Sequence, residues 1–202
     1  AETQLYAIQN ILSSNSYQRY FPEYINPQEG QREKWSQRKF SIDHVKRKLE
    51  GVRDPTVATA GLTTNTTGWH ADVILADDLV VPENAYTEDG RESVKKKASQ
   101  FTSIRNAGGF TMACGTRYHP KDLYSDLIAI NIDQYDETGQ RCGGEELFDS
   151  REWAVENAGD GTGEFIWPRT QSPDGKWFGF NQEELAKKRG TYLNPVHFRA
   201  QY

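Results

Sequence analysis

The chain has 202 residues, 36% of them hydrophobic, and a formal net charge of −5. This length gives one or at most two domains with a substantial core. No apolar run reaches membrane-spanning length, and the negative charge argues against a protein that simply coats nucleic acid. The two cysteines, Cys114 and Cys142, lack the spacing of a zinc site or a disulfide framework, so a reducing cytoplasm is the default compartment.

Charge is unevenly distributed along the chain. Residues 31–53 hold eight Lys or Arg against three acids, whereas residues 122–164 hold twelve acids against two arginines. A solvated surface explains each block by itself. The asymmetry also allows one face to meet DNA while another meets a basic partner.

The first predicted elements are a helix, an ambiguous segment and a strand. Apolar residues recur at helical spacing from Glu2 to Ser14. From Trp35 to Leu49 both an alternating strand pattern and a helical pattern fit. Thr56 to Leu62 is rich in β-branched residues and follows a proline, which favours a strand.

The stretch from Val73 to Val80 organises the rest of the chain. Four apolar residues, Val73 to Ala76, predict a short strand that is buried on both sides. It ends in Asp77 and Asp78, and a carboxylate beside a buried strand requires a metal, a cation or several N–H donors. The alternative is that these aspartates cap the next helix or begin a turn.

A helix and a second strand follow this stretch. Pro82 to Asn84 reads as a turn. Glu88 to Ile104 predicts a helix, because acidic residues precede lysines as the helix dipole favours. Asn106 to Gly109 is expected to end that helix, and Phe110 to Cys114 is expected to form a short buried strand.

Strand, helix and strand in this order predict a parallel pair in an α/β fold. Ligands of such sheets bind at the carboxyl ends of the strands. Asp77, Asp78 and Thr116 all fall at that edge, which favours a functional site there.

The remainder of the chain, from Pro120 onward, is less regular. Pro120 to Ile130 predicts a helix with Ile130 facing inward, and Asp133 to Gly163 predicts loops with one short amphipathic piece at Phe148 to Val155. A short strand is expected at Phe165 to Pro168, and a last helix at Gln182 to Arg189.

Two motifs at their mutual distance resemble a known family. The sequence DVILADDL (Asp72 to Leu79), followed by GTRYHPKDLY (Gly115 to Tyr124), resembles the large terminase subunit of tailed bacteriophages, the ATP-driven motor that packages DNA into a procapsid. Supporting segments make the resemblance span nearly the whole chain; they are Glu2 to Gln4, Asp54 to Val57, Thr67 to Asp72, Phe165 to Arg169 and Phe198 to Tyr202.

The resemblance implies a role for each motif residue. Asp77 would be the Walker B carboxylate that holds Mg²⁺ through water, and Asp78 the carboxylate that orients or activates the attacking water. Many relatives carry the longer Glu at the second position. Gly115 and Thr116 would match the coupling motif, in which the hydroxyl senses the γ-phosphate of ATP. Arg117 would reach phosphate in cis or across a subunit boundary, unless it forms a plain ion pair.

One motif of the family is absent from these 202 residues. No G-x-x-x-x-G-K-[S/T] sequence occurs, and the glycines from Gly159 to Gly163 lie in an acidic loop. Residues 1–202 therefore resemble the C-terminal half of the terminase ATPase domain, part of a P-loop (ASCE/RecA-like) core with a mainly parallel sheet. We expect the P-loop to come from sequence outside this chain, the nuclease domain to be absent from these residues, and the chain alone to be inactive.

The resemblance also implies partners. These are double-stranded DNA, the portal protein, the small terminase subunit and further copies in a homo-oligomeric ring, in the host cytoplasm and transiently docked on the procapsid portal. Two other functions remain open. One is a metal-dependent nuclease that uses Asp72, Asp77 and Asp78. The other is a non-catalytic phage structural or binding module whose aromatic region, Trp153 to Phe180, forms an interaction surface.

Overall fold

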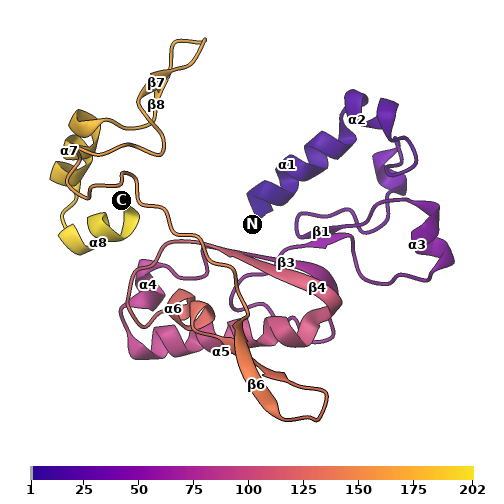
Figure 1. Cartoon of the computed structure of the whole chain (residues 1–202). Helices are drawn as coiled ribbons and strands as arrows, with labels where there is room; N and C mark the ends of the chain where they lie inside the picture. Colours follow the sequence, from indigo (N-terminus) through magenta and orange to yellow (C-terminus); the bar gives the residue numbers. More distant parts are fainter. Residues whose placement is uncertain (1) are drawn as a thin grey trace. The chain divides into compact units, whose positions relative to one another are not determined.

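A computed structural model describes residues 2–202 and divides them into two compact units. The first comprises residues 2–79 and 96–114, and the second comprises residues 80–95 and 115–202. Figure 1 shows the elements in chain order. Within the described residues, no helix has the length and apolar character needed to cross a membrane.

The first unit begins with helices, and the predicted N-terminal helix is confirmed as α1 (Glu2–Ser13). Helix α2 (Asn15–Tyr20) and the 3-10 helix η1 (Glu29–Gln31) follow. Leu5 of α1 is buried, as are Ile25 and Phe40.

The ambiguous segment contains both predicted structures. Strand β1 (Lys39–Phe40) comes first and helix α3 (Val45–Leu49) second. Strand β2 spans only Val57–Ala58, which is shorter than predicted, and it pairs antiparallel with β1.

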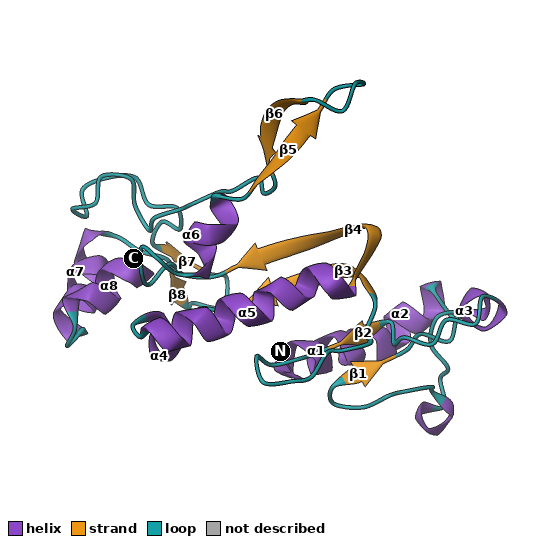
Figure 2. Ribbon diagram, turned by 90° about the horizontal axis from the view of Figure 1, so that it is seen from below, coloured by secondary structure: helices purple, strands orange, loops and turns teal. Residues whose placement is uncertain are grey.

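The predicted parallel pair is confirmed. Strands β3 (Ala71–Asp77) and β4 (Arg105–Cys114) run parallel and are connected through helix α5 (Glu88–Ile104), whose bounds are those predicted. Residues 96–104 of α5 belong to the same unit as the two strands and lie alongside them in Figures 1 and 2.

The predicted glycine stop after α5 is wrong, because β4 begins at Arg105 directly after the helix. The two glycines lie inside the strand, where the register shifts between Ala71 and Val73. Gly108 has a φ of 78°, and a Cβ on Gly109 would lie 2.5 Å from the Asp72 carbonyl oxygen. These glycines therefore permit an irregular start of the ladder rather than a helix cap.

The expectation that β3 is buried on both sides is also wrong. Ile74 and Ala76 are buried, but Leu75 between them is 71% exposed. On the same face, Val73, Phe110 and Met112 are exposed, and Cys114, predicted to be buried, is exposed as well. A two-stranded sheet with one helix beside it buries only one face, so this unit leaves an apolar sheet face, defined by Val73, Leu75, Phe110 and Met112, open.

The second unit contains short helices around the predicted GTRYHP segment. Helix α4 (Pro82–Ala85) replaces the predicted turn; the Val81 N–H donates to Asn84 Oδ1 at its start (2.9 Å). Helix α6 (Leu123–Ile128) begins later than Pro120 because Asp122 is its N-cap residue. Ile130, predicted to face inward, lies beyond the helix and is 37% exposed.

Two antiparallel hairpins were not predicted. Strands β5 (Asn131–Tyr135) and β6 (Arg141–Glu146) form one, and β7 (Thr170–Gln171) and β8 (Trp177–Phe178) form the other. No helix forms at residues 148–155, and residues 165–168 make only isolated bridges.

The last two helices each contribute a buried residue to a hydrophobic cluster of this unit. These are α7 (Gln182–Thr191), which was predicted, and α8 (Pro195–Gln201), which was not. Val155, Leu185 and Phe198 are buried together, with partly buried aromatic residues around them: Phe165, Phe180, Tyr192 and Tyr202.

The fold is thus mixed α/β. Among the described residues the sheets are two-stranded, and only β3–β4 is parallel. The expectation of a mainly parallel sheet is wrong for these residues, because β3–β4 is the pair connected through a long helix, whereas β5–β6 and β7–β8 are connected by tight turns.

Candidate functional site

The paired carboxylates lie where the parallel strand β3 ends. Asp77 is its last residue and pairs with Cys114, the last residue of β4. Asp77 and Asp78 are both exposed, and within the described residues of their unit neither side chain has a hydrogen-bond or ion-pair partner. Both carboxylates are therefore open to a ligand at the carboxyl edge of this sheet.

Asp78 has a left-handed backbone, with a φ of 47°. Its N–H still donates to the Cys114 carbonyl oxygen (3.0 Å), so the hydrogen bonding of the ladder extends one residue past the strand before the chain turns. A left-handed conformation costs an L residue roughly 1 kcal/mol or more, and Asp tolerates it better than most. Such strained residues cluster at functional sites.

The geometry disfavours a nuclease site formed by three aspartates. Asp72 precedes Asp77 by five residues in an extended strand, which places their Cα atoms about 16 Å apart. The Asp72 carboxylate instead accepts a hydrogen bond from Asn106 Nδ2 (2.9 Å). Across residues 2–202, no three His, Cys, Asp or Glu side chains gather as a metal site.

Asp77 is compatible with Mg²⁺ held through water. Carboxylate oxygens and waters are ligands that Mg²⁺ prefers, and protein cages with several ligands are not required when phosphates supply the rest. An exposed Asp77 without a competing cation in its unit fits this mode of binding.

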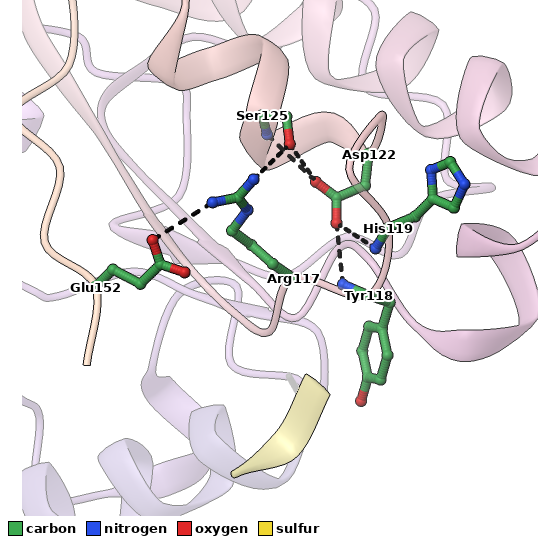
Figure 3. Close-up of polar contacts among 6 residues, drawn as sticks. All are labelled: Arg117, Tyr118, His119, Asp122, Ser125 and Glu152. Carbon is green, nitrogen blue, oxygen red and sulfur yellow. Dashed lines mark hydrogen bonds and ion pairs between the residues drawn. The ribbon is translucent and has the colours of Figure 1, made fainter. Parts of the chain in front are cut away.

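A buried carboxylate organises the GTRYHP segment in the second unit. Asp122 is completely buried. Its Oδ2 accepts the backbone N–H groups of Tyr118 (3.0 Å) and His119 (3.2 Å). Its Oδ1 accepts the N–H of Ser125 (3.2 Å), which caps helix α6. Figure 3 shows one side chain holding both the loop and the helix start.

The Arg117 side chain contacts two side chains outside this loop, Ser125 and Glu152. Its Nη2 donates to Ser125 Oγ (3.0 Å), and its Nη1 lies 3.4 Å from Glu152 Oε2 (Figure 3). The Glu152 side chain is 72% exposed, so the ion pair is weak. The structure therefore contains the plain ion pair that was the alternative for Arg117.

Thr116 and Gly115 follow Cys114 in the chain. Thr116 is half-buried, and among the described residues of its unit its hydroxyl has no hydrogen-bond partner. A Cβ at Gly115 would overlap the hydroxyl of Tyr124, which is buried, and lie 2.6 Å from its Cζ. Glycine is therefore required immediately before Thr116.

Other residues of the loop have structural contacts. His119 Nδ1 accepts the Lys121 N–H (3.0 Å), a contact within the turn. Gln201 Nε2 donates to the Tyr118 hydroxyl, and the Tyr86 ring lies 6.5 Å from that of Tyr118. Helix α8 and the end of helix α4 thereby hold the loop through Tyr118.

The glycine-rich segment from Gly159 to Gly163, which lacks the P-loop pattern, surrounds the carboxylate of Glu156. Buried Glu156 accepts the N–H groups of Ala158 (2.9 Å), Gly161 (2.8 Å) and Gly163 (3.1 Å). These bonds, that of Gly161 most of all, lower the pKa of Glu156. The backbone donors of this loop are therefore occupied by the chain's own anion and not arranged for a phosphate.

Two features of the site were missed from sequence. Asp122 belongs to the motif but was assigned no role, although Asp directly before an apolar helical run is a known N-cap signal. The left-handed backbone of Asp78 has no sequence signal beyond the tolerance of Asp for that conformation.

Comparison with known proteins gives a partial similarity. No protein-family model matches the chain. A stretch of 50 residues, 25% of the chain, is 36% identical to the large terminase subunit of Enterobacteria phage T3. The match covers 8% of the length of that protein. The chain is thus similar, over part of its length, to the kind of protein that its motifs resemble.

Proposed function

We propose that the chain is a component of a viral DNA-packaging motor that couples ATP hydrolysis to translocation of double-stranded DNA. The observation that carries the proposal is the pair of exposed carboxylates at the carboxyl edge of β3–β4, which have no partner among the described residues of their unit, since ligands of parallel sheets bind at this edge. The similarity to a phage terminase large subunit supports the same assignment.

In this proposal each residue has one task. Asp77 holds the waters around Mg²⁺, and Asp78 accepts a hydrogen bond from the attacking water and orients it. The metal, when bound, neutralises charge on the phosphates. The Thr116 hydroxyl senses the γ-phosphate, and Arg117 exchanges Glu152 for a phosphate oxygen.

The proposal assigns the P-loop to sequence outside these 202 residues. Parallel strands are usually covered on both faces, yet the apolar sheet face of Val73, Leu75, Phe110 and Met112 is exposed in this unit. A segment that brings a P-loop strand and its helix would cover that face. Packing of that segment against the sheet would thus complete both the hydrophobic core and the nucleotide site.

The partners follow from the same role. They are the portal protein, the small terminase subunit and further copies of the motor subunit in a ring, with the complex transiently docked on a procapsid in the host cytoplasm. Double-stranded DNA is the substrate that such a ring moves.

The experiment compares the chain alone with the chain joined to a complementary segment that carries a P-loop. Steady-state ATP hydrolysis is measured with Mg²⁺ and again with EDTA. The chain alone should be inactive, and the joined protein should hydrolyse ATP only with Mg²⁺. Turnover by the 202 residues alone that depends on Asp77 would overturn the proposal, and so would a folded joined protein without turnover.

A further inference from the structure

The first unit contains a basic pocket that the proposed ATPase site does not use. Its volume is about 330 Å³, and helix α3 and the turn after it supply much of its lining. Four cationic side chains line it, from Lys34, Arg47, Lys48 and Arg53, against one carboxylate, Glu33. The pocket belongs to the basic block of residues 31–53 in a chain of net charge −5.

Arg47 is fixed in this pocket with an unused donor. Its Nη2 donates to the Asp54 carbonyl oxygen (2.6 Å) and to Ser41 Oγ (3.4 Å). Its Nε is buried and has no hydrogen-bond partner among the residues that the structure describes. Within the described residues no carboxylate pairs with Arg47, so its charge is also uncompensated by an ion pair. A buried donor without an acceptor is costly, and a guanidinium without an ion pair adds a full positive charge to the lining of the pocket.

Lys34 contributes a second cation from a strained position. Its φ is 48°, a left-handed conformation that is uncommon for lysine. Its ammonium donates to the Arg53 carbonyl oxygen and lies 3.8 Å from Glu33 Oε1. The Glu33 side chain is 52% exposed, so this pair is weak and leaves the ammonium available to a stronger anion.

We propose that this pocket binds a phosphate group, either a phosphodiester of the DNA backbone or a free phosphate. One fixed guanidinium and three flexible cations suit a tetrahedral oxyanion that accepts several hydrogen bonds, and Arg and Lys are the usual phosphate ligands. The single opposing carboxylate leaves a formal excess of three positive charges over the lining residues. This site is distinct from Asp77 and Asp78 and does not depend on their role.

The test uses the full 202-residue chain and two double variants that each remove two positive charges. Lys48→Gln with Arg53→Gln alters the pocket. Lys39→Gln with Lys46→Gln is the matched control, because both residues are exposed, belong to the same basic block and do not line the pocket. Binding of a fluorescent 20-bp duplex is followed by anisotropy across a salt series, and binding of inorganic phosphate by calorimetry.

The pocket variant should bind its ligand about tenfold more weakly than the control. If the ligand is DNA, the slope of log affinity against log salt should also fall by about 1, because losing the one phosphate that the pocket neutralises reduces it by about 0.9. A reduction in affinity confined to the duplex identifies the DNA backbone, and one confined to inorganic phosphate identifies a free phosphate. Equal binding by the two folded double variants, or no binding of either ligand by the parent chain, would overturn the proposal.

Discussion

Replacing Asp122 by alanine should loosen the GTRYHP loop and the start of helix α6 together. Asp122 is completely buried and accepts backbone N–H groups from Tyr118, His119 and Ser125 at 3.0 to 3.2 Å. Loss of an N-cap costs about 1 kcal/mol. Each of the two loop N–H groups left without an acceptor adds about 1 kcal/mol more. We therefore expect Asp122→Ala to reduce the free energy of unfolding by about 3 kcal/mol.

Asp122→Asn is the matched control, because it preserves shape and one acceptor oxygen. That oxygen can serve either the loop N–H groups or Ser125, but not both. We expect a cost of about 1 to 2 kcal/mol, between the parent and alanine.

Urea denaturation of the full chain measures these costs as a shift in midpoint at constant slope. Amide hydrogen exchange gives the local readout: protection of Tyr118 and His119 should fall on the order of 10²-fold in Asp122→Ala. The reasoning is refuted if Asp122→Ala unfolds at the urea concentration of the parent and both amides keep their protection.

Three further predictions concern single side chains. In the protein joined to a P-loop segment, Asp78→Asn should keep nucleotide binding and lose on the order of 10²- to 10⁴-fold in hydrolysis rate; near-normal turnover would make Asp78 structural. Thr116→Val should leave ATP binding intact and abolish DNA translocation in a packaging assay with procapsid and portal, whereas packaging at the parent rate would exclude a coupling role. Because backbone N–H groups, led by that of Gly161, lower the pKa of Glu156 below its ordinary 4.5, its stabilising effect is present above the unfolded-chain pKa and is lost as pH falls through the folded pKa. Glu156→Gln should therefore flatten the fall in stability below about pH 4.5 in acid titrations, and an unchanged acid profile would contradict the assignment.

The parallel pair and its helix could be predicted because their signals are local. The charge order and apolar spacing of Glu88 to Ile104 indicate a helix, and apolar runs on each side indicate strands. The position of Asp77 and Asp78 at the carboxyl end of β3 follows from that topology.

The features that could not be predicted depend on contacts between residues distant in sequence or on the backbone conformation of single residues. Leu75 is an apolar residue in an apolar run, which is typical of a buried strand. Whether its face of the sheet is buried depends on which other elements pack against it, and the sequence of the strand does not show this. The β5–β6 hairpin joins strands of largely polar sequence, so apolar periodicity does not reveal it, and its turn depends on Gly139, which has a φ of 80°. The Arg47 Nε has no partner among residues 2–202; its position depends on the fold of residues 41–54, which no sequence motif indicates.

We propose that Asp77 engages Mg²⁺-nucleotide at the edge of β3, and Asp72 on the same strand offers a matched control. In the joined protein, Mg²⁺-dependent ATP hydrolysis is compared between Asp77→Asn and Asp72→Asn, which remove the same charge from the two ends of one strand. We expect Asp77→Asn to lose hydrolysis by at least about 100-fold and Asp72→Asn to remain near the parent rate. Equal rates in the two variants would contradict it.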